Sequence, residues 1–359
     1  MSKGQTYEHE RVEFADAGTG AEIVQLTSFP TVSVCLPYVS PCFTPDSRRL
    51  IFVSQRQAAR DAPWDLFRVD VDGSDLTQLT ETEGIAPCGL TPDGAAALFT
   101  RGSSLWRVEM DTCRETEVAR ADGFVLSGLG HPWPDGRHLF VCARRSNGAD
   151  GLLRLDLAGG APLFVPGAEG VSVTLHSCSP GGAGLLAIRT GPAGMSYALL
   201  DADLRERALF TSGFDFAHCT FLGRSDRLQG CGLPPLRAIL TLAPGEGDPR
   251  PLAEGPYFWH SASSLCGEWI VADTNWPDEG IQLVHVPTGR ARPLCRPGSS
   301  EGHPQRTHPH PRFSPDGRVA LYNSDRTGIT QIYTVRVTDE ARERLRAGDL
   351  RRTDRTFAR

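Results

Sequence analysis

Short apolar runs separated by Gly, Pro and Asp recur along the whole chain. One phrase marks each recurrence: an apolar or aromatic residue, Ser or Thr, Pro, Asp and often Gly. Clear copies lie at residues 43–46, 90–94, 133–136 and 313–317, and weaker copies lie at residues 178–182, 221–226 and 264–267. An apolar run follows each phrase, then a second run after a short loop, and usually one more short strand. This pattern predicts strands throughout and shows no long helical period.

The seven copies follow one another at intervals of roughly 40 to 50 residues, which with four short strands per unit is typical of β-propeller blades. We therefore predict an all-β, seven-bladed β-propeller. Residues 22–27 resemble the fourth strand of a blade yet precede the first repeat, while the last repeat has only three strands. The N-terminal strand is expected to complete the last blade and close the ring. Residues 1–338 then form one propeller domain. Residues 339–359 form a charged tail, which either forms a helix or is disordered, and its default interpretation is a solvated end.

Composition narrows the classes of partner and compartment. The 359-residue chain has 37 basic and 43 acidic residues and a net charge of −6, which does not favour nucleic acid or an anionic membrane as a partner. There is no apolar run of 18 residues, and the first residues lack the apolar region of a signal peptide. The ten cysteines include no Cys-x-x-Cys pair. Scattered free thiols of this kind favour a reducing compartment and predict a cytoplasmic protein.

The segment before the last Ser-Pro-Asp-Gly phrase contains candidate metal ligands. It reads Gln305, Arg306, Thr307, His308, Pro309, His310 and Pro311. On an extended strand residues i and i+2 share a face, so His308 and His310 are expected to point at one place, with the Gln305 amide nearby. Neutral imidazole is the commonest metal ligand. The alternative interpretation is a pair of solvated histidines at the end of a loop.

Three more histidines occupy the position of His310 in earlier repeats. Aligned on the turn phrase, these are His176, His218 and His260, so blades four to seven each begin their first strand with His. The first strand of a propeller blade lines the central channel, and equivalent residues converge as a ring at one mouth. Repeats can share residues for packing reasons alone. However, blades one to three carry Tyr38, Pro87 and the pair His131-Pro132 there, so the fold does not require His.

With these residues the chain resembles the oligogalacturonate lyases of pectin breakdown, a family of seven-bladed propellers with TolB-like repeats. The resemblance rests on residues 20–27, on residues 42–46, and above all on the motif Gln305-x-x-His308-x-His310-Pro311. It implies a manganese ion held by three His and one Gln, which by position are His218, Gln305, His308 and His310. All four side chains are neutral, and the same set would accept other divalent transition metals.

The resemblance also implies a reaction, β-elimination at a uronate residue of a short acidic oligosaccharide. A metal on the carboxylate would stabilise the developing enolate while a base removes the C5 hydrogen. His176 matches the position of the family's base, and His260 could bind the second sugar or its carboxylate. A family Arg in blade three falls on Gly151 here. Arg144 or Arg145, in the preceding loop, could replace it in substrate binding.

Two other classes of function remain open at this point. One is a non-catalytic binding module that scaffolds a protein partner through its rim, as TolB-like propellers do. The other is a metal-bearing propeller enzyme that acts on a different acidic sugar or by hydrolysis or epimerisation, which the loss of the family Arg at Gly151 leaves open. The sequence contains no Gly-x-Ser-x-Gly elbow and no Walker-type Gly-Lys-Ser/Thr. It leaves the oligomeric state undetermined.

Overall fold

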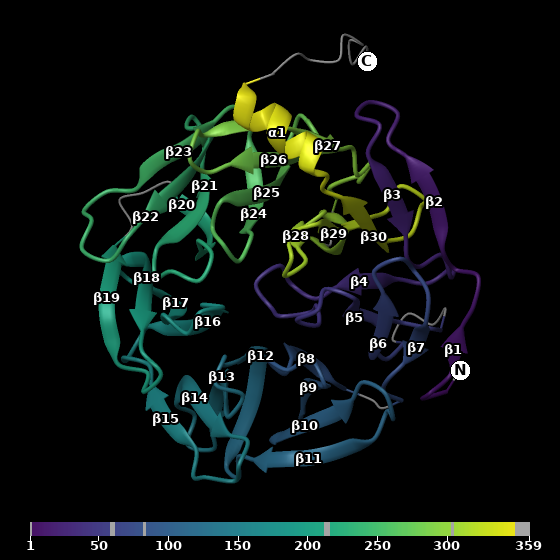
Figure 1. Ribbon diagram of the computed structural model, residues 1–359. Helices are drawn as coiled ribbons and strands as arrows, with labels where there is room; N and C mark the ends of the chain where they lie inside the picture. The colour runs from purple at the N-terminus through teal and green to yellow at the C-terminus, as the bar shows by residue number, and fades with distance from the viewer. Residues whose placement is uncertain (1, 58–61, 82–83, 212–215, 303–304, 349–359) are drawn as a thin grey trace.

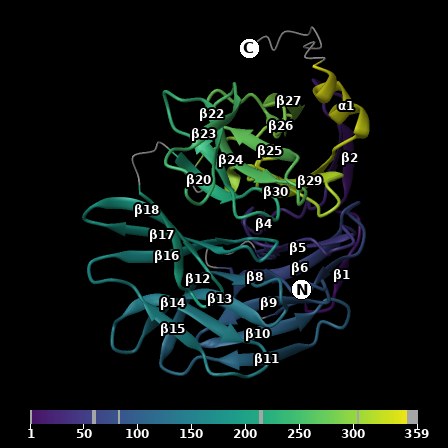
Figure 2. The same cartoon turned by 60° about the vertical axis from the view of Figure 1, so that its left-hand side comes forward.

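The computed structural model describes residues 2–57, 62–81, 84–211, 216–302 and 305–348. These residues form seven antiparallel sheets, which are arranged in a ring (Figure 1). This arrangement confirms the prediction of a seven-bladed β-propeller. Figure 2 shows the same ring in an oblique view, with its left-hand side turned toward the viewer.

The first three blades are β4–β7 (Ser33–Cys35, Arg49–Ser54, Asp65–Asp70, Leu76–Gln78), β8–β11 (Ala86–Leu90, Ala96–Arg101, Ser104–Glu109, Glu115–Arg120) and β12–β15 (Phe124–Pro132, His138–Arg145, Asp150–Asp156, Leu163–Pro166). The next three are β16–β19 (Ser172–Cys178, Leu185–Gly191, Gly194–Leu200, Glu206–Thr211), β20–β23 (Phe216–Phe221, Leu228–Gly232, Ala238–Leu242, Arg250–Glu254) and β24–β27 (Phe258–Ser263, Trp269–Thr274, Ile281–His285, Arg290–Cys295). Within each of these blades consecutive strands pair.

The Ser/Thr-Pro-Asp phrase is a hydrogen-bonded turn between the first two strands of a blade. The Thr44 hydroxyl donates to Asp46 Oδ1 at 2.6 Å and accepts the backbone N–H of Arg49 at 3.0 Å. Ser314 makes the same two bonds, to Asp316 at 2.6 Å and from Val319 at 3.1 Å. The repeated residues are therefore explained by local backbone capping, which fixes where the second strand of a blade starts.

The seventh blade joins both ends of the chain. Its strands β28 (Arg312–Phe313), β29 (Val319–Ser324) and β30 (Gln331–Arg336) are followed in the sheet by β3 (Glu22–Gln25) and β2 (Val12–Ala15). In the β3–β30 ladder Ile23 lies opposite Val335. A further N-terminal strand, β1 (Thr6–Tyr7), pairs with β7 at the outer edge of blade one. The N-terminal residues thus form hydrogen bonds with both blade one and blade seven.

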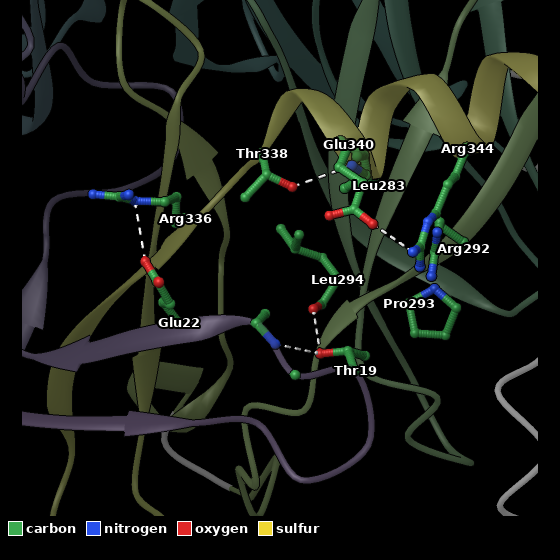
Figure 3. Close-up of a pocket in the computed structure, with 13 residues that line it drawn as sticks. Thr19, Glu22, Leu283, Arg292, Pro293, Leu294, Arg336, Thr338, Glu340 and Arg344 are labelled. Carbon is green, nitrogen blue, oxygen red and sulfur yellow. Dashed lines mark hydrogen bonds and ion pairs between the residues drawn. The ribbon is translucent and has the colours of Figure 1, made fainter.

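The start of the C-terminal segment is a helix docked on the propeller, which is one of the two forms expected for this tail, although its docking was not expected. Helix α1 (Asp339–Ala347) is capped by Thr338, whose side chain accepts the N–H of Ala341. Leu345 is fully buried, and the guanidinium groups of Arg342 and Arg346 lie 5.5 and 5.0 Å from the Trp269 ring. Figure 3 shows where the N-terminal segment, blade six and the start of α1 meet. There the Thr19 hydroxyl donates to the Leu294 carbonyl, and Arg336 forms an ion pair with Glu22.

All ten cysteines are free thiols, and eight of them are buried, as expected for small core residues. In the part of the chain that the structure describes, no helix is long and apolar enough to cross a bilayer.

The closing strand β3 is expected to contribute to the free energy of unfolding. Ile23 is fully buried in the closing strand, whereas Val12 in the neighbouring strand β2 is 46% exposed. We expect Ile23→Ala to lower the free energy of unfolding by about 2–5 kcal/mol, because it leaves a cavity at the closure. Val12→Ala should cost less than about 0.5 kcal/mol. Urea unfolding of both variants checks this, and equal losses would show that the closing strand adds no particular stability.

Candidate active site

The first strands of blades four to six each bend at a β-bulge where they carry their histidine. The register of the ladder shifts between Leu175 and Ser177, which brackets His176. It shifts likewise between Ala217 and Thr220 around His218, and between Phe258 and Ser261 around His260. A bulge leaves a residue unpaired and re-aims its side chain. In these three blades the histidine therefore lies at a local break in the ladder, which sets the direction of its side chain.

Three histidines come together as a potential metal site. The ligand nitrogens of His260, His308 and His310 all lie within 4.8 Å of one another. The ring centroids of His260 and His310 are 4.0 Å apart, and those of His260 and His308 are 5.6 Å apart. Three imidazoles at this spacing fit a first-row divalent metal, which readily accepts nitrogen ligands and keeps further positions for oxygen.

Asp273, on β25, holds two of these histidines. Its carboxylate accepts a hydrogen bond from the backbone N–H of His260 at 2.6 Å, pairs with Nδ1 of the same residue at 3.0 Å, and accepts the backbone N–H of His310 at 3.0 Å. Because Nδ1 of His260 faces this carboxylate, Nε2 is the nitrogen directed to the cluster. A carboxylate behind a histidine is the usual partner of a metal ligand, because it fixes the ring and raises its basicity.

Burial would raise the pKa of Asp273, but the neighbouring His260 and His310 outweigh it and lower the pKa to about 2. The carboxylate is therefore ionised at neutral pH, and a negative charge lies beneath the cluster. In the sequence Asp273 is an ordinary residue at the end of an apolar run, and no motif there distinguishes it.

The paired histidines converge for a different reason from the one predicted. His308 and His310 do not lie on a strand, because Gln305–Thr307 form a short 3-10 helix, η1, and β28 begins only at Arg312. His308 N–H donates to the Gln305 carbonyl at 2.9 Å, and His310 adopts a left-handed φ of 47°. The Glu301 carbonyl accepts from Nε2 of His308 at 3.1 Å, so that Nδ1 is the nitrogen that can act as ligand.

His218 lies beside the cluster rather than within it. Its ring centroid is 4.5 Å from that of His260, but the group of mutually close ligand nitrogens contains His260 in its place. His218 also has a positive φ of 54°. Burial and the adjacent His260 lower the pKa of His218 to about 4. Its ring is therefore neutral at physiological pH, as is that of His176, whose pKa burial lowers to about 4.

Tyr38, from the loop after β4, packs under the histidines of three blades. Its ring is nearly parallel to that of His310, at a centroid distance of 6.0 Å and an angle of 14°, and lies 5.7 Å from the ring of His260. Its hydroxyl donates to the His218 carbonyl at 3.3 Å. Sequence alignment placed Tyr38 at the ring position of blade one, where it supports the histidines in the folded protein.

The group of three histidines does not include the other predicted site residues. Gln305 stands exposed in η1, and its role as a ligand stays a prediction. Arg144 forms a two-bond ion pair with Asp150, at 2.7 and 3.0 Å, across the end of the β13–β14 ladder in blade three. Arg145 lies over Phe124 and Phe164, at 5.4 and 5.1 Å. Both arginines have structural partners, and a role in substrate binding stays a prediction.

Gly151 has a packing reason of its own. A Cβ atom there would lie 2.3 Å from the Val165 carbonyl oxygen on β15. The two strands approach so closely that no side chain fits at this position. Gly151 therefore belongs to a tight β14–β15 pair, and an arginine could not simply be restored there.

Two further titratable groups with buried polar atoms were not among the predicted site residues. Glu301 has a buried carboxyl oxygen without a hydrogen-bond partner among the described residues, and burial, with Asp273 and Asp278 nearby, raises its pKa to about 8. His131, on the inner strand of blade three, is fully buried, and neither ring nitrogen has a partner in the described part of the chain. Burial, with a smaller effect of His176, lowers the pKa of His131 to about 3.

Comparison with known proteins agrees with this architecture. A family model described as oligogalacturonate lyase matches residues 1–130. The oligogalacturonate lyase of Dickeya dadantii (strain 3937) is 24% identical over 404 aligned residues, which cover 94% of this chain and 99% of that protein. The oligogalacturonide lyase of Pectobacterium atrosepticum is 25% identical, with the same coverage. These matches confirm the resemblance to the oligogalacturonate lyase family.

Solved structures show the same fold. An oligogalacturonate lyase in complex with manganese superposes with a TM-score of 0.79 at 23% identity, covering 95% of this chain and 99% of that one. The oligogalacturonate lyase of Vibrio parahaemolyticus superposes with a TM-score of 0.78 at 18% identity, covering 94% and 100% of the two chains.

The buried His131 is expected to make the stability of the protein depend on pH. Its pKa is lowered from 6.5 to about 3 in the fold, so between these values the unfolded chain binds a proton that the folded protein does not. Its contribution therefore makes stability fall as the pH drops from about 6.5 to about 3, by roughly 1 kcal/mol per pH unit. We expect His131→Leu to flatten this dependence in urea unfolding between pH 7 and pH 4. The exposed control His9→Leu should leave it unchanged, and an equal slope in all three proteins would contradict the prediction.

Proposed function

We propose that this protein is a metal-dependent lyase that cleaves short uronate oligosaccharides of the oligogalacturonate type by β-elimination. The observation that carries the proposal is the cluster of His260, His308 and His310 over Asp273, in a propeller that resembles oligogalacturonate lyases over 94% of its length. The manganese in the related structure supports a divalent metal in this cluster. The same resemblance supports an enzyme of the polysaccharide lyase class.

We assign the ligands as His260, His308 and His310, with Gln305 as the predicted fourth. A divalent metal bound there would act as a Lewis acid on the substrate carboxylate and favour the loss of the adjacent C5 hydrogen. Asp273 fixes the ring of His260 and the backbone of His310, so the donor atoms are held in place before substrate arrives. This assignment replaces His218 by His260, because His260 shares the group of close nitrogens with the His308–His310 pair.

Proton removal falls to a neutral histidine next to the cluster. A base must reach the carbon adjacent to the bound carboxylate, which lies a few ångströms from the ligands. His218, with its ring 4.5 Å from His260, satisfies this requirement, while His176 lies one blade further round the ring. We therefore favour His218 over His176 as the residue that accepts the C5 proton. The C4 glycosidic oxygen then leaves, and an unsaturated uronate remains.

The first test concerns the metal. After reconstitution with manganese, the wild-type protein should contain about one metal per chain and convert digalacturonate into an unsaturated product. His308→Ala and His260→Ala should lose most of the metal and at least about a hundredfold in kcat/KM, because each removes one of three nitrogen ligands. The exposed His9→Ala is the matched control and should retain both. A wild-type protein that binds no metal would contradict the proposal and favour a binding module. Metal without product would favour a different acidic sugar.

The second test separates the two candidate bases. His218→Ala should keep the metal and lose about a hundredfold or more in kcat, since general-base catalysis contributes at least that factor. His176→Ala should lose far less. Loss of metal in His218→Ala would instead restore His218 as a ligand, and a larger loss of kcat in His176→Ala would restore His176 as the base.

A further inference from the structure

Trp276 is the most exposed large apolar side chain among the described residues, with 81% of its surface accessible. It lies in the loop that follows β25 of blade six. An indole ring is mostly buried in folded proteins, because its large apolar surface is costly to hydrate. The packing of the chain does not explain why such a ring stands in solvent.

The position of the loop relates Trp276 to the histidine cluster. In blade six Phe258 pairs with Thr274, so the end of β25 lies at the same mouth of the channel as the start of β24, which carries His260. The N–H of Asn275 donates to the Tyr257 carbonyl at 2.8 Å. Asp273, the residue that holds His260 and His310, precedes Trp276 by only three positions.

Hydrogen bonds tie this loop down on both sides of the exposed ring. The backbone N–H of Trp276 donates to the side-chain oxygen of Asn275 at 2.7 Å. The N–H of Glu279 donates to the Thr274 hydroxyl at 2.8 Å, and that of Gly280 donates to Asp278 at 2.7 Å. A ring presented on a fixed loop loses little conformational freedom when a ligand packs on it.

A second tryptophan of the same blade, Trp259, packs against a histidine of the site and against Tyr257, to which this loop is hydrogen-bonded. The Trp259 ring is 4.7 Å from the ring of His218 and 5.6 Å from that of Tyr257. Its Nε1 atom is buried and has no hydrogen-bond partner within the described residues. A buried indole N–H normally has an acceptor, so an oxygen atom from outside the chain is expected to supply one here.

We propose that Trp259 and Trp276 form a sugar-binding subsite next to the histidine cluster. Trp259 donates its N–H to an oxygen of the sugar at the cluster, and Trp276 packs against the C–H face of the neighbouring pyranose ring. A pyranose combines a flat face of C–H groups with polar oxygens at its rim, which matches one exposed indole face beside one unpartnered donor. This inference rests on the proposed function for the identity of the substrate as an oligouronate.

The subsite has a consequence for specificity. An indole face recognises the C–H groups of a ring and makes no direct ion pair with a carboxylate. The sugar on Trp276 is therefore recognised by its shape, and a neutral or methyl-esterified ring is bound there as well as an acidic one. The charge requirement of the substrate then falls on the single sugar at the histidine cluster.

The test uses the full-length protein reconstituted with manganese, with digalacturonate and its methyl ester at the outer sugar as probes. Trp276→Ala should raise KM for both probes by about tenfold, because the stacked ring contributes about that factor to the affinity for the sugar. The variant should leave kcat and metal content unchanged. Trp259→Phe, which keeps the aromatic packing on His218, should lower kcat/KM by about tenfold through loss of its N–H. The matched control is Leu209→Ala, another exposed apolar residue, which should match wild type. Unchanged KM in Trp276→Ala would overturn the inference.

Calorimetric binding of the same probes separates this inference from the proposed function. If the wild type turns over neither probe but binds both, the proposed lyase activity fails, while a tenfold weaker affinity of Trp276→Ala still supports the subsite. If the wild type produces the unsaturated sugar and Trp276→Ala has unaltered affinity, the lyase assignment stands and the subsite is wrong. Absence of any binding by the wild type contradicts both.

Discussion

The candidate site depends on the buried carboxylate of Asp273. It accepts the backbone N–H groups of His260 and His310 and pairs with the ring of His260, so one side chain links blades six and seven. An ionised carboxylate in this position is costly unless it is compensated. Its compensation comes from the histidines, and a cation bound to them would add to it. The same interaction that fixes the geometry therefore also favours binding of a metal.

Because Asp273 joins two blades, the site depends on how the ring is closed. His308 and His310 precede β28, and blade seven is completed only when β3 from the N-terminal region pairs with β30. Tyr38, from blade one, then packs against His310 and donates to the His218 carbonyl. Residues from blades one, five, six and seven thus meet at one mouth of the channel. A defect in closure is expected to misplace the histidines before it unfolds the protein.

The fold could be predicted from the sequence because its signal is repeated. Each Ser/Thr-Pro-Asp turn is a local hydrogen-bonded unit, and seven copies with apolar runs leave few architectures. The histidine positions were also readable, since they share one register in four repeats. The prediction combined His218 with His308 and His310, and this role of His218 stays a prediction; the group of mutually close ligand nitrogens contains His260. Bulges and positive φ values decide where each ring points, and neither leaves a mark in the sequence.

Residues that act through tertiary contacts were the hardest to predict. Asp273 is informative only once the backbone of His310 is brought to it from 37 residues away. Similarly, an exposed Trp276 and an orphaned Trp259 N–H cannot be recognised before burial is known. Trp259 and Asp273 lie in the β24–β25 strand pair with His260, and Trp276 lies in the loop directly after β25. Blade six therefore contributes a ligand, the carboxylate behind it and the proposed sugar contacts, so substrate recognition and metal binding rest on the same rigid hairpin.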